Sequence, residues 1–60
     1  MERAFVQREA EKLQNTDYFP RNDDGDHLGL IVDELMAASS ELVVAMVVKE
    51  GLDTFFEEHP

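Results

Sequence analysis

The run LVVAMVV at residues 42–48 constrains this chain most, because it carries no polar side chain. A helix of that composition is apolar on nearly every side and is normally covered all round. The whole chain has only 60 residues, one small domain spanning 1–60, and a domain of that size buries only about 60% of its unfolded surface. We therefore expect a second copy of the chain or a partner protein to cover part of this run.

The N-terminal residues 2–15 have the pattern of an amphipathic helix. They contain good helix formers without glycine or proline, and their apolar residues fall on one side of the helix: Phe5, Val6, Ala10 and Leu13. Tyr18 and Phe19 precede a proline, which disfavours helix. We expect these two rings to fold back onto the first helix as a small plug.

A second, longer helix is predicted from about residue 26 to 50, after a loop that reaches about residue 25. Its apolar stripe recurs at helical spacing and continues in phase through Ser39 and Ser40. The stripe consists of Leu28, Ile31, Val32, Leu35, Ala38, Leu42 and Met46. A β-strand at residues 42–48 is the competing interpretation, because the run is rich in valine.

The predicted fold is therefore all-α, a helical hairpin with one long helix that assembles as a dimer or bundle. Gly51 is expected to end the long helix, and a short C-terminal turn follows. The side chains predicted to form the partner or dimer interface point away from the stripe or lie in this last turn: Val44, Val47, Val48, Phe55 and Phe56.

The net charge of −9 comes from 14 acidic and 5 basic residues, and Lys49 is the one base after residue 21. Phosphate binding depends on cationic side chains, so we expect no direct binding to nucleic acid or to an anionic membrane. A basic protein surface is the partner that this charge favours, and acidity also keeps a small apolar protein in solution. The predicted acidic surface consists of Asp33, Glu34, Glu41, Glu57 and Glu58.

The motif NDDGDH at residues 22–27 has two interpretations. The oxygen ligands of a calcium EF-hand would fall on Asn22, Asp24, Asp26 and Asp33. However, His27 replaces the required glycine, and the closing glutamate is missing. A transition metal on Asp24 and His27 would need His59 with Glu57 or Glu58 from another subunit. We predict no metal and no cofactor.

The second interpretation of NDDGDH is a helix cap. Asp26 immediately precedes the apolar stripe, where its carboxylate can accept free backbone N–H groups and complement the helix dipole. Asp23 or Asp24 takes this role if the helix begins earlier. We predict Asp26 as the cap.

Catalytic chemistry finds little support in the sequence. The chain has no cysteine and two histidines that lie 32 residues apart, and Ser39 and Ser40 lack a glycine elbow. The adjacent acidic pairs 33–34 and 57–58 diverge by about 100° on a helix and do not converge as a dyad. The sequence predicts a protein that is not an enzyme.

One family resemblance is carried by the start of the long helix, DHLGLIVDELMA. It resembles the helix start of the TorD-like redox-enzyme maturation chaperones, at Asp26, His27, Leu28, Gly29, Leu30 and Asp33. The later stretch Phe55-Phe56-Glu57-Glu58-His59 resembles a second motif of that family. The resemblance implies an all-helical protein that binds signal peptides of redox enzymes, with this chain a piece or relic of such a chaperone.

The function that the residues favour is protein–protein binding, as a small acidic regulator, adaptor or inhibitor of the kind found in phage and other mobile elements. Its expected partners are a second copy of itself and a protein target, whose basic surface it would mask or whose groove it would enter. No targeting segment is visible in the charged N-terminus, and no apolar run approaches the about 20 residues of a membrane span. We expect a cytoplasmic protein.

Overall fold

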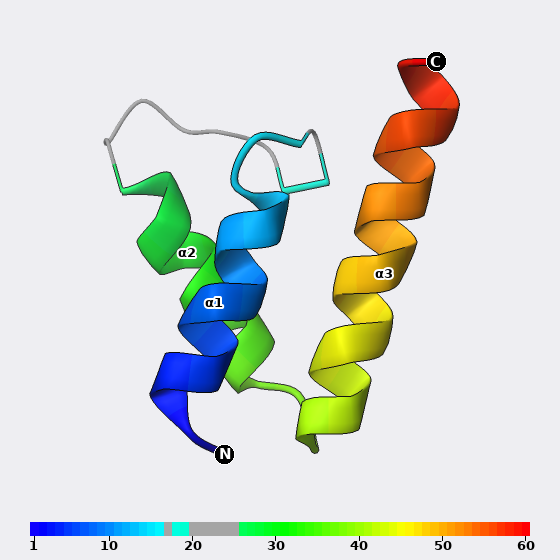
Figure 1. Cartoon of the computed structure of the whole chain (residues 1–60). Coiled ribbons are helices and arrows are strands. Elements are labelled where there is room, and N and C mark those ends of the chain that lie inside the picture. The colour runs from blue at the N-terminus through cyan, green and yellow to red at the C-terminus, as the bar shows by residue number, and fades with distance from the viewer. Residues whose placement is uncertain (17, 20–25) are drawn as a thin grey trace.

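The computed structural model describes residues 1–16, 18–19 and 26–60, and these residues form three helices (Figure 1). They are α1 (Arg3–Leu13), α2 (His27–Met36) and α3 (Glu41–Glu58). The predicted all-α fold is confirmed. Residues 42–48 are helical, so the strand interpretation of that run is wrong.

The helix α1 packs against both α2 and α3, whereas α2 and α3 scarcely touch each other (Figure 1). The molecule measures 32 × 27 × 15 Å between Cα atoms, so it is about two helix layers thick. None of the helices in the described part of the chain combines the length and the hydrophobicity needed to cross a membrane.

A single hydrophobic core lies where α1 meets the other two helices. The four largest side chains that are fully buried in it come from all three helices: Val6, Leu13, Ile31 and Val44. The other buried core residues are Ala10, Val32, Leu35 and Val48. Every helix thus contributes an apolar face, which is how a chain of this size gathers a core without disulfides.

Asp26 caps α2, as predicted. Its side chain accepts a hydrogen bond from the backbone N–H of Gly29, with Oδ1 2.9 Å from the nitrogen. A Cβ atom on Gly29 would lie only 2.8 Å from that oxygen, so a glycine leaves the carboxylate room to reach the helix end. Asp26 and Gly29 together therefore determine the capped N-terminus of α2.

The prediction of one continuous helix from 26 to 50 is wrong, because the chain breaks between α2 and α3. Ser40 adopts an extended backbone conformation, and its hydroxyl accepts the N–H of Val43 at 3.2 Å. The acidic Glu41 follows in the first turn, where it complements the helix dipole. A serine that satisfies a free N–H group offers the backbone an alternative to a continued helix, and here it starts a new one.

This break changes the side of α3 that faces the core. Leu42 and Met46, predicted to extend the apolar stripe, are 70% and 61% exposed. Val44 and Val48, predicted to need a second copy of the chain for burial, are 0% and 2% exposed within one copy. One chain therefore buries two of the three valines expected to need a partner, because α3 as a separate helix turns them toward α1, and Val47 is left half-buried.

Gly51 does not end a helix, contrary to the prediction. It lies buried inside α3, where a Cβ atom would come within 2.8 Å of Leu13 Cδ2 and 3.0 Å of Tyr18 Cγ. The helix continues through Phe55 and Phe56, which were expected in a separate turn. It ends at His59, whose backbone N–H and ring Nδ1–H each donate to the Phe55 carbonyl at 2.9 Å.

Candidate functional site

The turn after α1 reverses the chain and places the site. The buried hydroxyl of Thr16 donates to the carbonyl of Leu13 at 2.8 Å and accepts the N–H of Tyr18 at 3.3 Å. Threonine favours such local bonds because its short side chain reaches neighbouring backbone groups. The turn directs Tyr18 and Phe19 back onto the helices.

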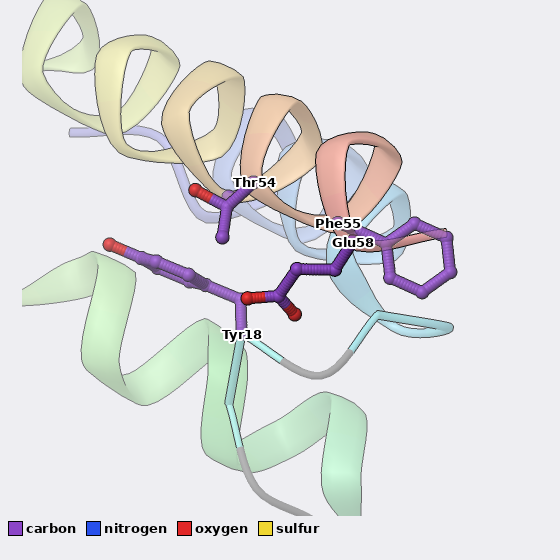
Figure 2. Close-up of a pocket in the computed structure, with 5 residues that line it drawn as sticks. Tyr18, Thr54, Phe55 and Glu58 are labelled. Atoms are coloured by element: carbon purple, nitrogen blue, oxygen red, sulfur yellow. The ribbon is translucent and has the colours of Figure 1, made fainter. Parts of the chain in front are cut away.

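Tyr18 and Phe19 form an aromatic pair in edge-to-face geometry, with ring centroids 5.1 Å apart and an interplanar angle of 87°. Phe19 packs against the core, and Tyr18 lies against α3 at Gly51. The predicted fold-back of the two rings is confirmed. They pack on the core and on α3, however, and not on α1 alone. Figure 2 shows Tyr18 between α2 and α3.

A basin of about 500 Å³ opens on one side of the Tyr18 ring. Its lining comes from the aromatic pair, the end of α2 and the start of α3: Tyr18, Phe19, Glu34, Leu35, Ala37, Ala38, Val43 and Val47. The helices α2 and α3 scarcely touch, and the basin lies between residues of both helices and these two rings. All of the lining except Glu34 and the tyrosine hydroxyl is apolar.

A smaller hollow of about 170 Å³ lies on the other side, lined by Tyr18, Gly51, Thr54, Phe55 and Glu58. The side chains of Thr54 and Glu58 project from α3 toward Tyr18 (Figure 2). The Phe55 ring points away from them and stacks on His59 at a centroid distance of 4.3 Å. The hollow offers a phenol, a hydroxyl and a carboxylate as hydrogen-bonding groups.

We call the basin and the hollow together the Tyr18 groove, since the Tyr18 ring lines both. Of the lining residues that the structure describes, Glu34 and Glu58 carry a charge, one in each part, and none is basic. The groove therefore consists of two recesses that share Tyr18, each with apolar side chains and one acidic residue in its described lining. Such a surface suits a ligand that is apolar along its length and basic at its edges.

The predicted interface residues divide among three environments. Val44 and Val48 lie in the core, and Val48 also lines a hollow between α1 and α3. Val47 and Phe55 are half-buried and line the Tyr18 groove. Phe56 is 63% exposed on a different side of α3. Val47 and Phe55 therefore form part of one candidate surface, and Val48 and Phe56 line another.

The predicted acidic residues are all exposed, but the structure does not gather them into one site. Glu34 and Glu58 line the Tyr18 groove, whereas the other three lie outside its lining: Asp33, Glu41 and Glu57. The acidic surface is thus spread over α2 and α3. It can influence a partner over a wide area, through its field rather than through one contact.

The motif NDDGDH, the possible metal loop of the sequence, lies partly outside the described residues, which include neither Asn22 nor Asp23 nor Asp24. Across residues 1–16, 18–19 and 26–60, no three histidine, aspartate or glutamate side chains gather as they would around a metal ion. Asp26 is occupied with the helix cap.

His27 is half-buried at the first turn of α2, and its two ring nitrogens are inaccessible and have no hydrogen-bond partner among the described residues. A buried polar group without a partner loses its hydration and gains nothing in return. Among the described residues, the His27 ring thus finds no hydrogen bond to offset its lost hydration.

Replacing His27 by leucine should raise the free energy of unfolding by about 1 kcal/mol, because an apolar side chain removes the unpaired nitrogens. Urea titration at neutral pH measures the change. His59→Leu is the matched control and should give no gain, since His59 is exposed, hydrogen-bonded and stacked on Phe55. A loss of stability on His27→Leu would mean that the imidazole has a polar partner in solution.

The sequence did not identify several of the lining residues as part of a binding surface. Leu35 and Ala38 were predicted in the stripe, and Val43 and Thr54 had no assigned role. Their position depends on the break at Ser40 and on the turn at Thr16. The hydroxyl side chains at these two positions were therefore the sequence signal for the groove.

Comparison of the chain with models of known families, with curated proteins and with solved structures finds no match. The residues that resemble the TorD-like chaperones lie at the start of α2 and at the end of α3. That resemblance stays a prediction.

Proposed function

We propose that this protein is a non-enzymatic binding protein, a regulator, adaptor or inhibitor, that receives a basic amphipathic helix of another protein in the Tyr18 groove. The observation that supports this proposal is the composition of the groove. Its floor is largely apolar, and the charged residues in its described lining are both acidic.

The apolar floor supplies the affinity. A helix laid between α2 and α3 would bury its own apolar face on Phe19, Val43 and Val47. Phe19 and Val47 already pack against the core. Burial of apolar surface contributes about 25 cal/mol per Å² before the cost of ordering the two partners. Binding of an amphipathic helix in a groove is a recurrent form of peptide recognition.

The charge supplies the selectivity. Glu34 and Glu58 can pair with lysine or arginine on the edges of the bound helix, and the net charge of −9 attracts a basic partner from a distance. An acidic partner is repelled by the same field. The protein would thereby mask a basic face of its target while its groove holds the apolar one.

The proposal is tested with two synthetic amphipathic peptides of about 18 residues, matched in their leucines and differing in lysine against glutamate on the polar face. Fluorescence anisotropy should show binding of the lysine peptide alone. Val43→Lys, which places a charge in the groove, should weaken binding about tenfold or more. Leu30→Lys makes the same charge change on an exposed leucine outside the groove and should leave most of the affinity.

Ionic strength separates the two contributions. Raising salt from about 50 to 500 mM shortens the screening length, so pairing at the rim weakens while the apolar contact persists. We expect a moderate loss of affinity. Equal binding of both peptides, or full binding by Val43→Lys, would contradict the proposal.

A further inference from the structure

A second groove lies on the opposite flank of α3, between α3 and α1. It has a volume of about 280 Å³ and is lined by Glu9, Lys12, Ala45, Val48, Lys49, Leu52, Asp53 and Phe56. We call it the α1–α3 groove. Its floor is apolar, and Phe56 stands 63% exposed at its edge.

The charged residues of the α1–α3 groove neutralise one another. Lys12 pairs with Glu9 at 2.5 Å, and Lys49 pairs with Asp53 at 2.6 Å. The hydrogen bond from Lys49 to Asp53, together with the charge of Asp53, raises the pKa of Lys49. On a chain of net charge −9, this groove is thus locally neutral, whereas the Tyr18 groove is acidic.

The same side of α3 carries a heptad pattern. Positions spaced by three and four residues read Leu42, Ala45, Lys49, Leu52 and Phe56. Four of the five are apolar, and such spacing keeps one seam facing a neighbouring helix. Leu42 and Phe56, at the two ends of the seam, are 70% and 63% exposed, so the single chain leaves both ends uncovered.

We infer that a second copy of this chain packs on the α1–α3 groove, with the two α3 helices antiparallel about a twofold axis at Lys49. Two chains of charge −9 repel each other, so self-association requires a face without net charge. This groove provides one. In a twofold dimer both copies use the same surface. The seam fits this symmetry, because Leu42 and Phe56 lie at equal distances along the sequence from Lys49.

The antiparallel direction follows from the charges at the ends of α3. A parallel pair would place Glu57 and Glu58 of the two copies together, and their repulsion would oppose association. An antiparallel pair separates these two acidic ends and places each near the N-terminus of the partner helix, where the positive dipole acts against its repulsion by a single glutamate, Glu41. It also brings Lys49 of each copy within about one helical turn of Asp53 in the other.

The size of the contact sets its strength. A standard interface buries about 800 Å² per partner, which is about a fifth of the 4214 Å² surface of this chain. One seam on an 18-residue helix gives less, so we expect a dimer that dissociates in about the micromolar range.

Sedimentation of the full chain from about 5 to 500 μM tests the inference by mass action. Wild type should shift from monomer to dimer over this range. Phe56→Glu should weaken the dimer about tenfold or more, because it adds two charges to the neutral face. Leu30→Glu makes the same change on exposed α2 and should weaken it far less. Circular dichroism checks that both variants fold.

A charge exchange makes the test specific. Lys49→Asp should abolish the dimer, and the double variant Lys49→Asp with Asp53→Lys should restore it, because local neutrality returns. Added salt should strengthen the dimer by screening the repulsion, opposite to its effect on peptide binding. The chain has no cysteine, so a mixture of Leu42→Cys and Phe56→Cys chains should cross-link heterologously if the helices run antiparallel.

A monomer at every concentration, or a dimer whose dissociation constant Phe56→Glu leaves unchanged, would overturn the inference. So would a dimer lost on Leu30→Glu alone. The inference stands apart from the proposed function, because the groove that binds the peptide lies on the other flank of α3. Phe56→Glu should therefore keep the affinity for the lysine peptide even as it abolishes dimers.

Discussion

Replacing Val44 by aspartate should unfold the protein, whereas the same replacement at Leu42 should leave it folded. Val44 is fully buried where α3 meets α1, and Leu42 is 70% exposed. Loss of a buried valine costs about 1.5–3 kcal/mol, and burial of a carboxylate without a partner costs more. Small domains have a total stability of about 0.05–0.15 kcal/mol per residue. The sum at Val44 therefore exceeds what a chain of this length can lose.

Far-ultraviolet circular dichroism with thermal melting measures both variants. Leu42→Asp should change the free energy of unfolding by about 0.5 kcal/mol or less. The pair discriminates between two helix arrangements, because one unbroken helix from 26 to 50 would bury Leu42 with the stripe and turn Val44 outward. A folded Val44→Asp together with an unfolded Leu42→Asp would therefore show that no break occurs at Ser40.

The sequence was sufficient to predict what local chemistry determines. The helicity of residues 3–13, the start of α2 at Asp26 and the all-α class follow from spacing and capping signals within a few residues. The break at Ser40 was also signalled locally, by two serines followed by Glu41. It was missed because the apolar spacing fits a continuous helix equally well, and only the hydroxyl bond to Val43 distinguishes the two.

The candidate site was less predictable, because it depends on residues that are distant in the sequence. Tyr18 reaches Gly51 across 33 positions, and nothing near Gly51 indicates that a ring will lie against it. A glycine near the end of an apolar run is more often a helix end, which is how it was interpreted. Val47 and Phe55 were assigned to a binding surface from their excess hydrophobicity, and they do line the Tyr18 groove.

Gly51 is the residue through which the fold and the Tyr18 groove depend on each other. Inside a helix glycine is poorer than leucine by nearly 1 kcal/mol, so propensity alone predicts that Gly51→Leu stabilises the protein. Packing predicts the reverse, because even a Cβ would lie 2.8 Å from Leu13 Cδ2 and 3.0 Å from Tyr18 Cγ. Leu13 is fully buried and cannot withdraw without opening the core.

We expect Gly51→Leu to lower the free energy of unfolding by about 2 kcal/mol, since overpacking of a filled core typically costs about 1–3 kcal/mol and a leucine adds a whole side chain. The displaced Tyr18 ring should also abolish binding of the lysine peptide. Thr54→Leu, an exposed position one turn further along α3, is the control and should change stability little. Urea titration and anisotropy measure the two effects.

A double-mutant cycle then shows whether Tyr18 is the neighbour that matters. Tyr18→Ala should remove part of the clash, so that Gly51→Leu costs less in its presence, with a coupling of about 1 kcal/mol or more. Independent, additive effects would place the Tyr18 ring away from Gly51. A stabilising Gly51→Leu would show that helix propensity alone governs this position and that Tyr18 and Leu13 do not pack against α3, in which case the Tyr18 groove would not exist in solution.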